Sequence, residues 1–105
     1  MPNVFEVTDS FGRQIICTED RWKFHILSHH PEMGNYLEDV KRAIQNPDLP
    51  ISVDAERSDR NLYYGRQSGR PRYVKVVVKI EGDQGSVVTA FLADSPKSGE
   101  MPIWK

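Results

Sequence analysis

The stretch Tyr73-Val-Lys-Val-Val-Val-Lys-Ile80 decides the fold of this chain. Its valines favour strands, and successive side chains of a strand point to opposite faces. One face is apolar, with Val74, Val76, Val78 and Ile80. The other face is mixed, with Tyr73, Lys75, Val77 and Lys79. The alternation predicts a strand that packs its apolar face on a core, and the lysines opposite suggest a surface for an anion.

Three further strands are predicted around this one. A Gly-rich turn at residues 81–85 leads into residues 86–93, and residues 51–55 and 62–66 come before it. Polar turns separate these segments, as in consecutive antiparallel strands. In residues 86–93 one face is expected to carry Val88, Ala90 and Leu92, and the other Val87, Thr89 and Phe91. The pattern predicts an antiparallel meander of four strands.

Two helices are predicted upstream of the meander. The first is expected to run from Glu19 to His29 or His30, because Thr18 suits an N-cap and Pro31 cannot follow a residue held in helical conformation. The second has the capping-box spacing of Asn35 and Glu38 at its start. Its apolar residues then recur at helical spacing, at Leu37, Val40 and Ile44, until Asn46-Pro47-Asp48 ends it.

The chain begins with a predicted hairpin, residues 4–8 and 14–17 around a turn at residues 9–13. Strands that are segregated from helices along the chain indicate an α+β fold with the helices on one sheet face. A length of 105 residues fits one domain, residues 1–105. The tail, residues 94–105, is expected to be a loop, with Ile103 and Trp104 packing back on the body.

The charge of the chain is small overall and uneven along it. The net charge of −1 gives no general attraction to nucleic acid. Between residues 57 and 79, however, seven basic residues stand against Asp59 alone, a balance of +6 by that count. They are Arg57, Arg60, Arg66, Arg70, Arg72, Lys75 and Lys79. This run fits either phosphate contacts or a charged sheet edge that prevents aggregation.

Composition also bears on location and cofactors. Cys17 is the single cysteine, which excludes an internal disulfide and a zinc site of several cysteines. The start has no basic segment followed by an apolar run, and no apolar stretch is long enough to span a bilayer. We therefore expect a soluble cytoplasmic protein, or one delivered without a local signal, that does not engage a membrane.

Several short motifs resemble one family of nucleases. In order, over residues 22–91, they are Trp22-x-x-His25-Ile26, His30-Pro31-Glu32, Asn46-Pro47-Asp48, Tyr63-Tyr64, the valine-rich strand and Val88-Thr89-Ala90-Phe91. Together they resemble the phage-borne branch of the barnase–EndoU–colicin–RelE-like (BECR) nucleases. The resemblance implies two helices followed by a four-stranded antiparallel sheet. It also implies a toxin-like ribonuclease that cleaves RNA without a metal or other cofactor, with a cognate antitoxin or immunity protein as a partner.

The resemblance also implies the site. Its polar positions match His25, His30, Glu32 and Thr89, which are the predicted catalytic residues. Metal-independent RNA cleavage needs a base and an acid, and histidine suits both because it titrates near neutral pH. The predicted substrate-binding residues are Arg66, Lys75 and Lys79 for phosphate charge and Tyr63 or Tyr64 for stacking on a base. The tyrosines are adjacent, so they face opposite sides of their strand.

Each of these residues also has a structural interpretation. His25 suits a half-buried imidazole that is bonded to a backbone carbonyl, and Thr89 is an ordinary strand residue. His30-Pro31-Glu32 fits a corner in which His30 caps the last carbonyls of the first helix. These alternatives lead to a second hypothesis, in which the chain is a non-catalytic protein-binding module of the same fold, or a decayed nuclease.

The same histidines also suggest a metal site. His25 and His29 have the i, i+4 spacing of helical zinc pairs. Ile26, however, stands where the His-Glu-x-x-His motif has its glutamate, and His29 and His30 point in different directions on a helix. We therefore predict no metal site.

Overall fold

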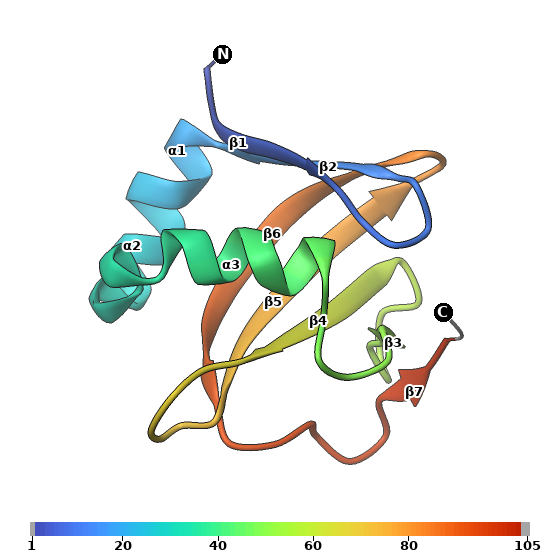
Figure 1. Ribbon diagram of the computed structural model, residues 1–105. Helices are drawn as coiled ribbons and strands as arrows, with labels where there is room; N and C mark the ends of the chain where they lie inside the picture. The colour runs from blue at the N-terminus through green and yellow to red at the C-terminus, as the bar shows by residue number, and fades with distance from the viewer. Residues whose placement is uncertain (1, 104–105) are drawn as a thin grey trace.

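A seven-stranded mixed sheet forms the body of the protein, in a computed structural model that describes residues 2–103 (Figure 1). Its strands are β1 (Asn3–Thr8), β2 (Gln14–Thr18), β3 (Ser52–Val53), β4 (Arg60–Arg66), β5 (Tyr73–Glu81), β6 (Gln84–Ala93) and β7 (Met101–Pro102). The helical elements are α1 (Glu19–Arg21), the π-helical turn η1 (Trp22–Ile26), α2 (Leu27–His29), the 3-10 turn η2 (Pro31–Asn35) and α3 (Leu37–Gln45). The predicted α+β class is confirmed.

The strand order is β1-β2-β6-β5-β4-β3-β7. Strands β3 to β6 pair antiparallel with their chain neighbours, as the meander requires. The N-terminal hairpin joins the same sheet, because β2 pairs in parallel with residues 84–86 of β6. At the other edge β7 pairs with β3. The predicted antiparallel meander of four strands is thus present as β3 to β6, but it is part of a larger sheet that has seven strands and is mixed.

The first helical segment has the predicted extent. It runs from Glu19 to His29 as α1, η1 and α2, and Pro31 follows. The Thr18 hydroxyl accepts a hydrogen bond from the backbone N–H of Arg21 at 3.1 Å, which confirms the N-cap. Trp22 and Ile26 are buried in the core, so the segment is anchored by one apolar stripe. The π-helical conformation of its middle was not predicted.

The second helix, α3, begins at Leu37. Its N-cap residue is Tyr36, with no side-chain capping bond, and Asn35 belongs to the preceding 3-10 turn. The predicted capping box was therefore wrong, because the turn after Pro31 takes up the residues that would have formed it. No helix within residues 2–103 has the length and apolar character needed to cross a membrane.

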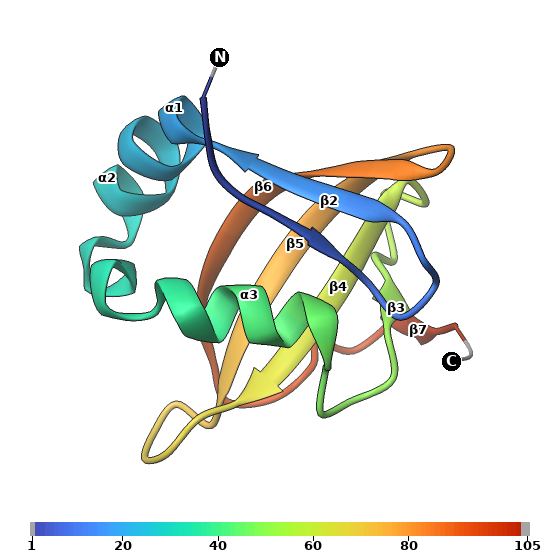
Figure 2. The ribbon, with the colours of Figure 1, turned by 45° about the horizontal axis from the view of Figure 1, so that its top comes forward.

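Helix α3 lies across β4 and β5 and covers one face of the sheet, here called the inner face (Figure 2). Its buried side chains, Val40, Ala43 and Ile44, pack against inner-face residues such as Val74 and Val76. The closest approach is at Gly65 of β4. A Cβ atom on Gly65 would lie 2.8 Å from the Ala43 Cβ, so glycine is what allows the helix to sit this close.

Replacing Gly65 with alanine is therefore expected to lower the free energy of unfolding by about 1–3 kcal/mol, the usual cost of overpacking a core. Chemical denaturation of the purified variant measures the effect. Gly34→Ala is the matched control, because its added Cβ would meet Leu27 Cδ2 at an ordinary 3.8 Å. Equal midpoints for the two variants would contradict the close packing of α3 on β4.

A bulge in β6 changes which side chains face the core. Val77 pairs with Thr89 but Val78 pairs with Val87, so Val88 is the extra residue. Val87 is therefore buried in the inner core together with Ala90, whereas the sequence pattern placed them on opposite faces. Thr89 and Phe91 remain on the opposite, outer face, across from Val77 and Lys75.

The outer face is covered in part by residues 94–103, here called the C-terminal strap. The strap runs from the end of β6 to β7 (Figure 2). Beneath it, Leu62, Tyr64 and Tyr73 form a second, smaller apolar cluster. Ile103 packs against the inner core, as predicted, and Trp104 lies outside the described residues. The sheet face opposite α3 is therefore only partly open.

A buried polar network lies where the N-terminal hairpin meets β4. Tyr63 donates a hydrogen bond from its hydroxyl to Asp9 Oδ2 at 2.6 Å, and the Arg13 guanidinium lies 2.9 Å from the same oxygen. Burial acts to raise the pKa of Asp9. The hydrogen bonds from Tyr63 and Arg13 outweigh it, and the pKa of Asp9 lies below its usual 3.8. The ionised carboxylate is therefore the form that fits the fold.

Asp9 is expected to contribute to acid sensitivity. Its folded-state pKa is below its unfolded value, so its stabilisation is complete above pH 3.8 and is lost as the pH falls through the folded-state pKa. Asp9→Asn is expected to lower the unfolding free energy at neutral pH by about 1–3 kcal/mol. Urea titrations from about pH 2 to pH 6 should show that difference narrowing in acid. Parallel curves for the two proteins would contradict the assignment.

Candidate functional site

The helical segment borders the part of β6 that continues beyond the parallel pairing with β2. Segments α1, η1 and η2 all contact β6. At the start of this border the Arg21 guanidinium donates from Nη1 to the carbonyl of Val88, the bulge residue, at 3.4 Å. The bulge thus brings a cationic side chain from the helical segment to the strand.

His30 lies further along the same strand. Its ring stacks on the Phe91 ring, with centroids 5.4 Å apart and an angle of 30° between the planes. Its Nδ1 lies 3.9 Å from Glu32 Oε2, so the two polar residues on either side of Pro31 are close. His30 therefore reaches the outer face of β6, where Phe91 lies.

Thr89 lies between these two contacts. It follows Val88 directly and precedes Phe91 by two residues, on the same face as Phe91. From Val88 to Phe91 the strand rises about 10 Å. Arg21, Thr89 and His30 are thus brought to one short length of β6. Arg21 was missed, although it stands four residues before His25, which is the spacing of neighbours on a helix.

His25 lies on the helical segment between Arg21 and His30. Its ring is 5.0 Å from that of His29, and His29 Nδ1 lies 2.8 Å from the His25 carbonyl oxygen. Partial burial, then the positive charges of Arg21, His29 and His30, lower the pKa of His25 below 6.5. The His25 imidazole is therefore neutral at neutral pH. Arg21, His25, His30 and Thr89 are together called the β6 edge site.

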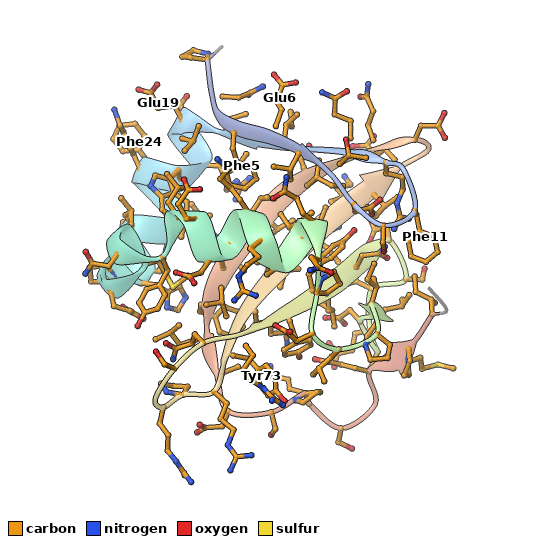
Figure 3. All side chains as sticks on the ribbon, in the orientation of Figure 1. Phe5, Glu6, Phe11, Glu19, Phe24 and Tyr73 are labelled. Carbon is orange, nitrogen blue, oxygen red and sulfur yellow. The ribbon has the colours of Figure 1, made fainter. Side chains whose placement is uncertain are left out.

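A hollow of about 310 Å³ opens beside His25. It is lined by Thr18, Asp20, Arg21, Phe24 and His25. Phe24 is 73% exposed and projects from the helical segment (Figure 3). The hollow thus offers a cation, an imidazole and an exposed aromatic ring to a ligand.

Lys75 is not free to meet a ligand in this structure. Its Nζ lies 2.7 Å from Glu100 Oε2, and both side chains are only 5% exposed. Tyr64 donates its hydroxyl to the other oxygen of Glu100 at 2.6 Å. The prediction of an accessible Lys75 was wrong, because the Glu100 carboxylate of the C-terminal strap pairs with it and both side chains are buried.

The prediction of a stacking tyrosine was also wrong. Tyr63 and Tyr64 face opposite sides of β4, as expected, but both are fully buried. Burial, followed by the hydrogen bonds to Asp9 and Glu100, raises the pKa of both hydroxyls. They are donors held in fixed networks, and the exposed aromatic ring is Phe24.

Arg66 and Lys79 lie at opposite ends of the outer face. Arg66 pairs with Tyr73 at the start of β5, and its guanidinium carbon is 5.9 Å from the Tyr73 ring centroid. Lys79 is exposed near the other end of β5 and pairs with Ser86. Six residues of strand separate Tyr73 from Lys79, about 20 Å. The two cations therefore serve different places and do not form one phosphate site.

Within residues 2–103, no three His, Cys, Asp or Glu side chains are grouped so as to hold a metal ion. The chain matches no protein-family model, and no curated protein or solved structure is significantly similar to it. The resemblance to BECR nucleases therefore stays a prediction that rests on the motifs in the sequence.

Proposed function

We propose that this protein is a metal-independent ribonuclease of the toxin-like kind, with the β6 edge site as its active site. The observation that carries the proposal is the position of His25 between two basic residues, Arg21 and His30, with its pKa lowered by burial and by neighbouring charges. A base of this kind near neutral pH is what the first step of RNA cleavage requires. A cognate antitoxin or immunity protein would be the natural partner of such an enzyme.

The reaction follows from these groups. Neutral His25 takes the proton of a ribose 2′-hydroxyl, whose oxygen attacks the adjacent phosphorus. The bond from phosphorus to the 5′-oxygen breaks, and protonated His30 gives its proton to that oxygen, with Glu32 beside it. Arg21 and the Thr89 hydroxyl hold the phosphate oxygens, where negative charge builds up. The products are a 2′,3′-cyclic phosphate and a free 5′-hydroxyl, and no metal takes part.

Two aromatic rings at the site, exposed Phe24 and half-buried Phe91, make single-stranded RNA the expected substrate. Unpaired bases can stack on an aromatic side chain, whereas paired bases cannot. Phe24 beside His25 and Phe91 beneath His30 are the rings nearest the proposed base and acid. They replace the tyrosines in this role.

Thr89 gives a specific test of the phosphate contact. Thr89→Val keeps the shape and strand propensity of the residue but removes the hydroxyl, and it is expected to slow RNA cleavage about 10- to 100-fold, the value of a hydrogen bond to a charged group. Thr89→Ser, which keeps the hydroxyl, is the matched control and should stay close to wild type. Steady-state cleavage rates of the purified proteins decide between them. Equal loss in both variants would assign Thr89 a purely structural role.

Expression in bacteria tests the proposal in cells. Induction of the wild-type protein is expected to stall growth and shorten the cellular RNA, and His25→Ala, made at the same level, is expected to do neither. Normal growth with intact RNA in both strains would contradict the ribonuclease proposal.

One observation favours a second function, a protein-binding module without catalysis. Phe24 is large, apolar and 73% exposed, which is typical of an anchor at a protein interface. This function predicts that Phe24→Ala abolishes cellular activity while His25→Ala and Thr89→Ala leave it intact. The ribonuclease predicts that His25→Ala has the larger effect.

A further inference from the structure

The most unusual polar group in the molecule lies under the C-terminal strap, outside the β6 edge site. Lys75 is in β5, a central strand, and its side chain is buried with Glu100 of the strap. Lys75 Nζ and the Tyr64 hydroxyl each approach a different oxygen of the same Glu100 carboxylate, at 2.7 Å and 2.6 Å. Two donors fixed by the sheet thus converge on one anion carried by a loop.

Stability alone is a poor explanation for this arrangement. A buried ion pair rarely makes a fold more stable than apolar residues of similar size, because both charges lose their hydration. Nζ also lies 5.4 Å from the Tyr64 centroid and 5.6 Å from the Phe91 centroid, over ring faces that attract a cation, so Lys75 keeps these contacts whichever anion it meets. The pair of donors is better explained by an anion that the site receives.

A phosphate group is the anion that fits. Like a carboxylate, it presents two oxygens side by side to two donors, and lysine is a common phosphate ligand. The site is also next to the proposed active site, because the Phe91 ring that borders Lys75 is the ring on which His30 stacks. RNA held at the β6 edge would bring a neighbouring phosphate toward Lys75.

The strap that carries Glu100 has little regular structure. Its end is attached through the short β7–β3 pairing and a hydrogen bond from Ile103 N–H to the Ile51 carbonyl at 2.6 Å. Between β6 and β7 it has no strand or helix. A cavity of about 180 Å³ lies beside Glu100, lined by Asp54, Ala55, Glu56, Lys97, Ser98 and Glu100. Glu100 therefore has space beside it, and Lys97 is a cationic partner there, next to the carboxylates of Asp54 and Glu56.

We infer that Lys75 and Tyr64 form a binding site for a phosphate group of RNA, and that Glu100 occupies this site in the unliganded protein as an internal competitor. The inference names the regulation of the proposed ribonuclease and rests on that function for the identity of the ligand. The phosphate site itself is tested without any cleavage reaction.

Binding of inorganic phosphate, measured by calorimetry at constant ionic strength, is the test. Glu100→Gln removes the competing charge and keeps the size of the side chain. It is expected to bind phosphate about tenfold or more tightly than wild type. In wild type the apparent affinity for phosphate is reduced by the fraction of molecules in which Glu100 leaves the site free. The matched control is the double variant Lys75→Met/Glu100→Gln, which has the same strap but no cation and should bind no phosphate. Equal phosphate affinity in all three proteins would overturn the inference.

A second variant keeps the test decisive if Glu100→Gln fails to fold. Val53 and Met101 lie directly opposite each other in the β3–β7 pair, so Val53→Cys/Met101→Cys can form a disulfide that ties the strap down. When oxidised, this variant should lose the phosphate binding that it shows when reduced. Identical binding in the two redox states would overturn the inference. Phosphate binding without RNA cleavage would support the anion site and contradict only the ribonuclease.

Discussion

Replacing Lys75 with methionine is expected to lower the free energy of unfolding by about 3–5 kcal/mol. The change removes the cation and leaves the Glu100 carboxylate in a place where it is only 5% exposed, with Tyr64 as its remaining partner. An unpaired buried charge must lose its hydration without compensation, which is the source of the cost. The free energy of unfolding of a small domain is about 5–15 kcal/mol, so the variant is expected to be only marginally stable. Urea denaturation followed by circular dichroism gives the value.

The double variant Lys75→Met/Glu100→Gln is the control for this result. It removes both charges, and Tyr64 can still donate to the amide oxygen of the new side chain. Most of the lost stability should return, because the cost comes from the unpaired charge and not from the loss of the pair. A single variant as stable as wild type, or a double variant no better than the single, would contradict the buried ion pair.

Removing either imidazole of the β6 edge site is expected to slow RNA cleavage by about 10²–10⁴-fold, the usual contribution of a general acid or base. His25→Ala and His30→Ala change partly exposed side chains, so their unfolding free energies should stay within about 0.5 kcal/mol of wild type. Loss of activity without loss of stability is the signature of a catalytic role. Single-turnover cleavage of a short RNA measures it.

The pH dependence adds a sharper test of His25. Burial and the charges of Arg21, His29 and His30 lower its pKa below 6.5, and only the neutral form can accept a proton. The rising limb of the profile of cleavage rate against pH should therefore lie below pH 6.5. His29→Ala removes one of the neighbouring charges, so it should keep activity but move this limb to higher pH. An unmoved limb, or a limb that survives in His25→Ala, would contradict the assignment of His25 as base.

Local signals in the sequence predicted the local structure well. Thr18 and Pro31 mark the ends of the first helical segment because capping and the restriction before proline act within a few residues. Alternation in β5 predicted its two faces because a strand repeats every second residue. The bulge at Val88 interrupts the same alternation in β6, and no residue type there predicts a bulge.

Local sequence patterns did not predict the contacts between segments that are distant along the chain. The parallel pairing of β2 with β6 joins residues some seventy positions apart and depends on the whole sheet. Lys75 was predicted on the outer face, which is correct, but its partner Glu100 lies in a segment with no strand pattern until β7. The same strap buries Tyr64, and the N-terminal hairpin buries Tyr63 with Asp9. The sequence therefore named the two imidazoles and the hydroxyl of the candidate site. It did not name the cation, Arg21, or the aromatic rings beside the site.

In the proposed reaction, His25 acts as the base in RNA cleavage without a metal. The most direct measurement incubates the purified protein with single-stranded RNA in excess chelator and analyses the ends of the products by mass spectrometry. Wild type should give fragments with 2′,3′-cyclic phosphate ends, and His25→Ala, folded to the same extent, should give about 100-fold fewer in the same time. Uncleaved RNA with the wild-type protein, or equal cleavage by both proteins, would contradict the claim.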